Sequence, residues 1–319
     1  MIISKTPLRI SLLGGGTDLP AFYEKSPGAV ISMAINRYVY IAVNEKFDNR
    51  FRVSYSITEN VDAVDEIRNP IVRHTLNHFK VKSGLEIISI ADVPGEGTGL
   101  GSSSAFTVGL INALDWHFDH DYRSPGVLAE TAFQIERGVH PDIGRQDAYA
   151  SAYGGFNYLR FHKTHVSVQP LEMSNEMFSW FLLLYTGVTR QSDFLLHVQR
   201  KGFEKDKEKV ALGKEMAELA SEFYRCFRAN SDIGLGTFMN NNWHLKRRIH
   251  DGISTPQIDA WYECAMQNGA LGGKLNGAGG GGFMLFYAPP DAHARIAEAT
   301  GLRRVDFDIE PEGSKVVYG

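Results

Sequence analysis

The order of apolar and polar residues along the chain predicts strands and helices that alternate. Apolar runs bounded by turn residues predict strands at residues 29–45, 51–56, 85–92 and 178–185. Apolar residues spaced three or four apart predict helices at residues 70–82, 105–114 and 125–139, and a short helix within 144–155 that ends at a glycine pair. The last part of the chain alternates helix, glycine loop, strand, helix and strand.

The longest predicted helix lies within residues 192–229. An i, i+4, i+7, i+11, i+15 spacing places five apolar side chains on one face, namely Leu212, Met216, Leu219, Phe223 and Phe227. Lysine and glutamate fill the other faces. The pattern predicts a helix with one face on the core and one face in solvent, with no need for a partner.

Length and composition indicate a globular protein of two domains. The chain has 319 residues and is 43% hydrophobic, against a usual domain size of roughly 100–200 residues. Neither an internal repeat nor a low-complexity linker marks a boundary. We therefore expect an N-terminal domain at residues 1–168 and a C-terminal domain at residues 169–319.

Charge and cysteine content narrow the class of partner. The net charge is −4 and the basic residues are dispersed, which argues against a nucleic-acid or anionic membrane partner and favours small molecules. Cys226 and Cys264 form no CxxC pair, so neither a disulfide framework nor a zinc site is indicated. The first residues are too short an apolar run for a signal peptide, and no run reaches the roughly 18 residues of a membrane span. We expect a cytoplasmic protein and leave monomer or homodimer open.

Residues 94–105, PGEGTGLGSSSA, carry the strongest chemical signal in the chain. They place four glycines and three serines between a predicted strand and a predicted helix. At such a junction backbone N–H groups and the positive end of the helix dipole converge, and the glycines allow positive φ and close approach. The loop therefore predicts a polyphosphate pocket. The alternative is a mobile turn, although an ordinary connection needs only one or two glycines.

Three familiar phosphate-binding patterns do not fit. A Walker A loop requires a lysine before its last hydroxyl residue, and this loop has no lysine. The run GAGGGG at residues 277–282 matches G-x-G-x-x-G but leads into FMLFYAP, a predicted strand, whereas the dinucleotide fingerprint opens a helix. The HRD and DFG triplets of protein kinases are missing.

Three segments instead resemble the GHMP kinase family. TPLRISLLGGGTD, residues 6–18, is similar to A-P-G-R-x-x-L-x-G-E-x-x-D. The serine-rich loop is similar to P-x-x-x-G-L-G-S-S-A, and KLNGAGGGGF, residues 274–283, is similar to K-x-x-G-A-G-x-G-G. Their order and spacing cover nearly the whole chain. The resemblance implies an α+β fold of two domains, one like ribosomal protein S5 and one ferredoxin-like, with the active site in the cleft between them.

The resemblance also implies ATP and Mg²⁺. The phosphates would lie on the loop residues Gly97, Gly99, Leu100, Gly101, Ser102, Ser103 and Ser104. Ser103 and Glu136 stand at the positions of the family's metal ligands, and one hydroxyl with one carboxylate suffices for Mg²⁺ beside phosphate oxygens. Without the resemblance, Glu136 would be interpreted as an ordinary exposed helix carboxylate.

Asp147, in GRQDAYAS, is the expected catalytic residue. By resemblance it accepts or orients the proton of the attacking sugar hydroxyl, and both roles stay open. Arg9 of the first segment would keep this carboxylate ionised, because an opposite charge within about 4–6 Å lowers the pKa of an acid by roughly 1–3 units.

Residues 15–18, in the first of these segments, indicate which phosphate acceptor the resemblance implies. Galactokinases usually carry Glu-His where this chain has Gly15 and Gly16, followed by Thr17 and Asp18. The Gly-Gly form resembles kinases that act on the anomeric C1 hydroxyl of D-glycero-D-manno-heptose 7-phosphate, for nucleotide-activated heptose and surface polysaccharide. Less close resemblances are to kinases of L-fucose or another hexose, and further off to mevalonate or homoserine kinases. A sugar sensor without turnover is an alternative from another class.

An acceptor that already bears a phosphate needs a cationic anchor. Arg190, near a predicted helix start, is expected to bind that phosphate, and the alternative is that it caps a surface turn. Lys274 and the glycines after it, with Gly279 beside the substrate, would shape the floor of the cleft. Loops around Asn69 are expected to contact adenine.

Overall fold

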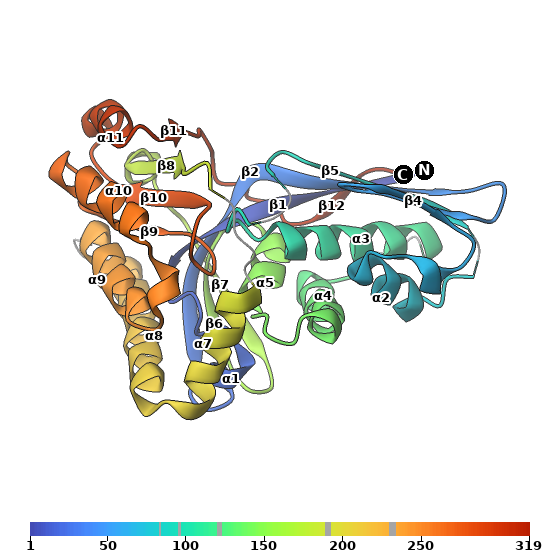
Figure 1. Ribbon diagram of the computed structural model, residues 1–319, viewed down its shortest axis with the longest axis horizontal. Helices are drawn as coiled ribbons and strands as arrows, with labels where there is room; N and C mark the ends of the chain where they lie inside the picture. Colours follow the sequence, from blue (N-terminus) through green and yellow to red (C-terminus); the bar gives the residue numbers. More distant parts are fainter. Residues whose placement is uncertain (83, 95–96, 120–122, 189–192, 230–233) are drawn as a thin grey trace.

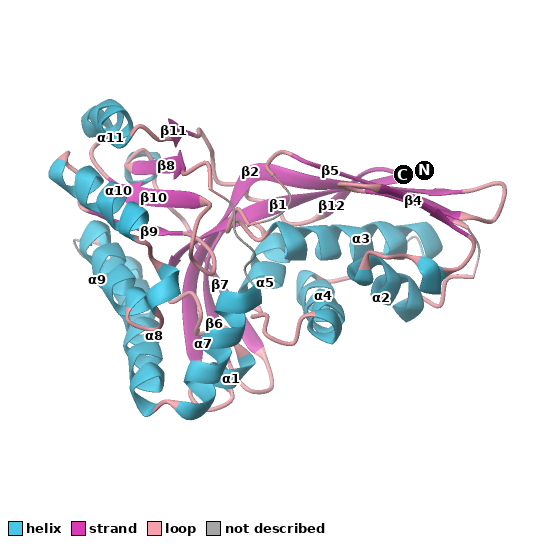
Figure 2. Cartoon of the chain, in the orientation of Figure 1, coloured by secondary structure: helices cyan, strands magenta, loops and turns pink. Residues whose placement is uncertain are grey.

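The computed structural model describes residues 1–82, 84–94, 97–119, 123–188, 193–229 and 234–319. The strands of these residues form two sheets (Figures 1 and 2). The larger sheet contains β1 (Ile2–Leu13), β2 (Gly28–Glu45), β3 (Phe51–Ser54), β4 (Thr58–Val61), β5 (Leu85–Ala91), β6 (Phe156–Phe161), β7 (Val166–Leu171) and β12 (Lys315–Tyr318). The smaller sheet has the order β11 (Arg303–Arg304), β8 (Phe181–Tyr185), β10 (Phe283–Tyr287) and β9 (Gly272–Leu275).

The helices lie beside and between these sheets (Figure 2). Those of the first half are α1 (Pro20–Tyr23), α2 (Pro70–His78), α3 (Ser102–Asp119), α4 (Pro125–Val139) and α5 (Gln146–Tyr153). Those of the second half are α6 (Asn175–Phe178), α7 (Asp193–Lys205), α8 (Lys207–Arg228), α9 (Leu235–Arg247), α10 (Pro256–Gln267) and α11 (His293–Thr300). Short 3₁₀ turns are η1 (Val64–Glu66), η2 (Asp251–Ile253) and η3 (Pro290–Ala292). In the described part of the chain, no helix has the length and apolar character that crossing a lipid bilayer requires.

The long strand β2 connects the parts of the larger sheet. Its residues 28–33 pair with β6 and its residues 39–45 pair with β5, while β1 runs antiparallel along both parts. The apolar run at the start of β2 is buried because α8 and the other strands pack around it. The larger sheet is therefore continuous, and helices lie against it at both ends (Figure 1).

Helix α3 is packed tightly against β1 and β2, and this packing positions its first turn. Val108, Leu110 and Ile111 are fully buried. At Gly109 a Cβ atom would lie 2.7 Å from Thr6 Oγ1, so glycine allows the helix to approach the strand. At the start of the helix, the Arg9 N–H of β1 donates to the Leu100 carbonyl at 3.0 Å. The serine-rich turn is therefore fixed relative to β1.

The C-terminal strand returns to the N-terminal half. β12 pairs with β1, and Figure 1 shows the two chain ends side by side. The predicted boundary at residues 168/169 falls inside β7, which pairs with β6 of the larger sheet. We therefore propose that the first domain extends through Leu171 and includes β12, and that the second comprises the segment between them.

Several sequence-based elements need correction. The helix expected within residues 192–229 is two helices, because the Asp206 carboxylate accepts from the N–H groups of Glu208 and Lys209 and thereby caps α8 at a new start. Residues 175–178 form α6, so β8 begins later than expected. The strands β6 and β7 were not predicted. Helix α4 has the predicted bounds, and residues 277–282 lead into strand β10, as expected.

Candidate active site

A cavity of about 390 Å³ lies between the two halves of the molecule. The first half contributes the end of β1, the glycine loop, α3, α4 and α5, and the second half contributes α7, α9, β9 and the glycine cluster 277–282. Most of the predicted site residues line it, namely Arg9, Gly15, Gly16, Asp18, Gly97, Gly99, Gly101, Ser102, Ser103, Ser104, Glu136, Asp147 and Gly279.

Arg9 and Asp147 form a bidentate ion pair in this cavity. Arg9 Nε donates to Asp147 Oδ1 at 2.8 Å, and an Arg9 terminal nitrogen donates to Oδ2 at 2.7 Å. The other terminal nitrogen donates to the Gly99 carbonyl at 2.5 Å. Arg9 is buried, whereas the Asp147 side chain is 29% exposed to the cavity. One guanidinium therefore holds a carboxylate and the glycine loop together.

Two serines in the first turn of α3 contact Glu136 of α4. Ser103 Oγ donates to Glu136 Oε1 at 3.1 Å, and Ser104 Oγ donates to Oε2 at 2.6 Å. The serines occupy the first turn of α3, where backbone N–H groups have no acceptor within the helix. Burial raises the pKa of Glu136 to about 7, although the serine hydroxyls oppose the shift and Asp147 adds to it. A hydroxyl and a buried carboxylate beside a helix N-terminus form a donor set that fits Mg²⁺.

Replacement of Glu136 by glutamine is expected to change how stability depends on pH. The pKa of Glu136 is higher in the folded chain, about 7, than the ordinary value of 4.5, so its proton stabilises the fold at low pH. In a chelating buffer, this group should lower the free energy of unfolding by about 3 kcal/mol as the pH rises from 4.5 to 7. Glu136→Gln should lack that decrease, as urea unfolding at several pH values would show.

The exposed Glu298 supplies the matched control for this prediction. Glu298→Gln should follow the wild-type pH dependence. Parallel stability curves for wild type and Glu136→Gln would contradict the shifted pKa of Glu136.

The two glycine motifs touch each other through their backbones. A Cβ atom at Gly277 would lie 2.5 Å from Gly99 Cα, and one at Gly282 would lie 2.3 Å from the Thr98 carbonyl oxygen. Both glycines have positive φ, +77° and +103° respectively. Thr98 Oγ1 is buried without a hydrogen-bond partner among the described residues. The backbone of the glycine cluster 277–282 therefore packs directly against the backbone of the glycine loop at Thr98 and Gly99.

Asp18 lies at the start of α5, the helix that carries Asp147. Its Oδ1 accepts from the Gly16 N–H at 2.9 Å and its Oδ2 from the Gln146 N–H at 3.1 Å. A Cβ atom at Gly144 would lie 1.9 Å from Asp18 Oδ2. Burial, followed by the charge of Asp147, raises the pKa of Asp18. The carboxylate thus lines the cavity and also caps α5.

Some predicted residues lie elsewhere. Thr17 and Leu100 are not among the residues that line the cavity, and Thr17 Oγ1 donates to the Gly14 carbonyl at 2.8 Å. Thr17 therefore supports the turn from behind. Arg190 lies outside the described residues.

Three residues that line the cavity were missed by sequence reasoning or given a lesser role. Lys246 of α9 is buried, and its Nζ donates to the Gly15 carbonyl at 2.8 Å and to Gln199 Oε1 at 3.1 Å. Gln199 of α7 in turn donates to the Ala278 carbonyl at 3.1 Å. Lys274 was expected to shape the cleft floor, yet its buried side chain lines the cavity. No local pattern marks Lys246 or Gln199, because tertiary packing brings them here.

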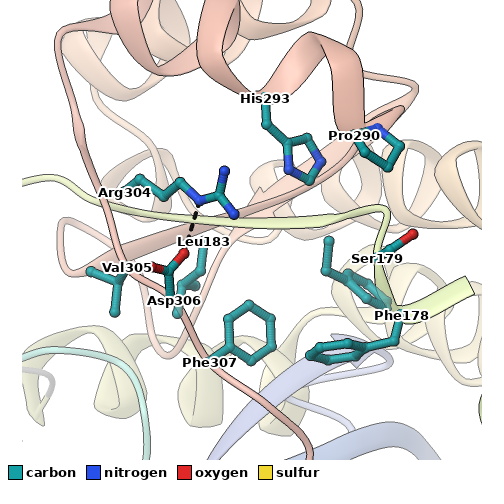
Figure 3. A pocket seen from close by; sticks show the side chains of 10 residues that line it. Phe178, Ser179, Leu183, Pro290, His293, Arg304, Val305, Asp306 and Phe307 are labelled. Atoms are coloured by element: carbon teal, nitrogen blue, oxygen red, sulfur yellow. Dashed lines mark hydrogen bonds and ion pairs between the residues drawn. The ribbon is translucent and has the colours of Figure 1, made fainter. Parts of the chain in front are cut away.

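A second cavity, of about 430 Å³, lies in the C-terminal half and is separate from these residues (Figure 3). Phe178 and Phe307 line it, with ring centroids 5.3 Å apart. Its Arg304 is paired with Asp306 at 3.0 Å. It contains none of the predicted site residues that the structure describes.

The first cavity combines the groups that phosphoryl transfer requires. It has backbone N–H groups at a helix N-terminus that suit an anion, a hydroxyl–carboxylate pair that fits a divalent cation, and a carboxylate held by an arginine. Little covalent chemistry is asked of a protein in such a transfer, because positioning and charge stabilisation account for the rate.

Comparison with known proteins agrees with this arrangement. Residues 67–155 match the GHMP kinases N terminal domain, and residues 214–300 match the GHMP kinases C terminal domain. The chain is 32% identical to D-glycero-alpha-D-manno-heptose 7-phosphate kinase of Campylobacter jejuni, over 98% of each protein. It is 23% identical to the bifunctional fucokinase/GDP-fucose pyrophosphorylase of Arabidopsis thaliana, over 95% of this chain and 31% of that protein.

The solved structures show the same fold. A D-glycero-D-manno-heptose 1-phosphate kinase from Bacteroides thetaiotaomicron superposes with a TM-score of 0.79 at 22% identity, over 100% of both chains. With both family domains matched in order and 32% identity to a relative over nearly its full length, this chain belongs to the GHMP kinase family and has its two-domain fold.

Proposed function

We propose that this kinase transfers the γ-phosphoryl group of ATP to the anomeric C1 hydroxyl of D-glycero-D-manno-heptose 7-phosphate and so forms the 1,7-bisphosphate. The acceptor is taken from the Campylobacter jejuni relative, which is similar along the whole chain. The absence of side chains at Gly15 and Gly16 leaves room for a sugar beside Asp18.

The observation that carries the proposal is the triple contact of Arg9. Its guanidinium binds both oxygens of Asp147 and the carbonyl of Gly99, so the carboxylate lies against the loop proposed to hold ATP. A hydroxyl bound to Asp147 would then lie beside the terminal phosphate, which is the proximity that transfer requires.

The donor side consists of main-chain groups and hydroxyls. Backbone N–H groups of the glycine loop and of the first turn of α3 would bind the phosphates of ATP. Ser103 and Glu136 would hold Mg²⁺, with Ser104 orienting the carboxylate. When bound, the ion would neutralise phosphate charge.

On the acceptor side, the C1 oxygen attacks the γ-phosphorus. The new bond joins that oxygen to phosphorus, and the bond from phosphorus to the β–γ bridging oxygen breaks, which releases ADP. Asp147 orients the hydroxyl and receives its proton. Arg9 offsets the charge that develops between donor and acceptor.

A magnesium-dependent ADP-release assay against a panel of acceptors tests the proposal. The panel contains the heptose 7-phosphate, the unphosphorylated heptose, L-fucose, D-galactose and mevalonate, and ³¹P NMR identifies the position of the new phosphate. We expect the heptose 7-phosphate to give the largest kcat/KM and a C1 phosphate. If L-fucose gave the largest kcat/KM, L-fucose would take the place of the heptose 7-phosphate as the proposed acceptor. Binding of both ligands without release of ADP would indicate a sensor.

A further inference from the structure

Lys246 and Lys274 are two buried lysines that the transfer step does not use. Both are at most 5% exposed and both line the cavity. Lys246 Nζ donates only to neutral acceptors, the Gly15 carbonyl and Gln199 Oε1, and within the described residues the side chain of Lys274 has no hydrogen bond or ion pair. Burying an unpaired charge is costly, so residues kept this way usually meet a partner that the free protein lacks.

The strand β9 aims Lys274 into the cavity. Successive strand residues point to opposite faces. At Gly273 a Cβ atom would lie 2.4 Å from Phe286 Cδ1, and Leu275 is buried in the core cluster, so these two positions face the protein interior. Lys274 between them faces the other way, toward the space that Lys246 also lines.

The charges around the lysines show which side of the cavity they belong to. Burial lowers the pKa of Lys246 to about 8, opposed by Asp18 and reinforced by Arg9. Burial also lowers the pKa of Lys274 well below its usual value, and the charge of Lys246 adds to this effect. Asp18 interacts with Asp147 as well as with Lys246, so it is near both.

We infer that Lys246 and Lys274 form a subsite for the phosphate group that the acceptor already carries. The inference rests on the proposed function, since an acceptor hydroxyl at Asp147 and a sugar ring at Asp18 direct the far end of the molecule toward Lys246. Arg9 is not available for that phosphate, because Asp147 and the Gly99 carbonyl hold its guanidinium at the proposed transfer point. A phosphate dianion supplies two negative charges to two lysines, whereas an unphosphorylated sugar supplies none.

A binding cycle in the presence of saturating Mg²⁺ and AMPPNP tests the subsite, because the nucleotide analogue fills the donor side. Calorimetry compares D-glycero-D-manno-heptose 7-phosphate with the unphosphorylated heptose. We expect wild type to bind the phosphorylated sugar at least about 10-fold more tightly, and this ratio to fall to about 3 or less in Lys274→Met. The Lys274 side chain has no hydrogen bond to lose in the free protein, so this variant should fold. Lys246→Met should lower the ratio as well.

The exposed Lys214 of α8 gives the matched control, and Lys214→Met should keep the wild-type ratio. An unchanged ratio in Lys274→Met would overturn the subsite. So would a variant in which AMPPNP binding weakens while the sugar ratio stays constant, because the lysine would then serve the nucleotide.

Binding of inorganic phosphate tests the subsite independently of which sugar the enzyme phosphorylates. Titrated with Mg²⁺ and AMPPNP present and followed by ³¹P NMR, inorganic phosphate should bind wild type and bind Lys274→Met at least about 10-fold more weakly. That result would support the subsite even if the acceptor panel showed that heptose is the wrong sugar. Wild type that binds no inorganic phosphate would overturn the subsite and leave the transfer reaction intact.

Discussion

Asp147→Asn is expected to lower kcat by at least about 100-fold while ATP binding stays close to that of wild type. Asparagine keeps the size of the side chain but removes the charge that orients the hydroxyl and receives its proton. In wild type the Arg9 guanidinium donates to both carboxylate oxygens of Asp147. In the variant, an amide N–H₂ group that cannot accept these hydrogen bonds replaces one of the oxygens. ADP release gives kcat, calorimetry with AMPPNP gives nucleotide affinity, and thermal unfolding checks the fold.

Asp291 is the control for this experiment because it is an exposed aspartate that does not line the cavity. Asp291→Asn should keep wild-type kinetics. A near-normal kcat in Asp147→Asn would remove Asp147 from the mechanism, whereas loss of AMPPNP binding would mean that the substitution disturbed the donor loop through Arg9.

The parts of the site that could be predicted from sequence are those whose signal is local. The loop before α3 joins a strand to a helix and is rich in glycine and serine, so the anion-binding role proposed for it follows from neighbouring residues alone. Arg9 could be found because it lies in a segment that resembles the family, and Glu136 and Asp147 because they stand at positions to which the resemblance assigns a metal ligand and a catalytic carboxylate. The structure brings all three to the same cavity.

Lys246 could not be found in this way. It is followed in the chain by Arg247 and Arg248, and all three carry the same sign of charge. Arg247 pairs with Asp259 at 3.0 Å and Arg248 lies close to Glu208 near the surface, whereas Lys246 is buried against Gly15. The difference arises from how α9 packs on the turn after β1, and no sequence pattern reports that packing.

Gly144 and Asp206 show two other limits of sequence reasoning. Gly144 carries no signal in the sequence for its role, yet its missing Cβ gives Asp18 the space to cap α5. Asp206 lies before the apolar stripe that begins at Leu212, and its capping of α8 divides the helix predicted within residues 192–229 into two. In both cases a short polar side chain that binds backbone N–H groups decides the structure.

Gly277→Ala is expected to reduce kcat/KM for ATP by at least about 10-fold. Two effects combine at this position. The residue has φ of +77°, which alanine adopts only with strain, and the new Cβ atom would lie 2.5 Å from Gly99 Cα. Relief of that overlap requires the backbone at Gly99 to move. Because the Gly99 carbonyl accepts from Arg9, the displacement would reach the ion pair with Asp147 as well as the phosphate loop.

Gly301→Ala separates backbone strain from the overlap. Gly301 has a similar φ of +65°, but a Cβ atom there would have no neighbour within 4 Å. Both variants should lose roughly 1 kcal/mol of stability from strain, measured by urea unfolding, while only Gly277→Ala should lose activity. If the two variants had the same kcat/KM for ATP, the glycine cluster would not support the phosphate loop. The family's third motif would then act through its own contacts with ligands and not through Gly99.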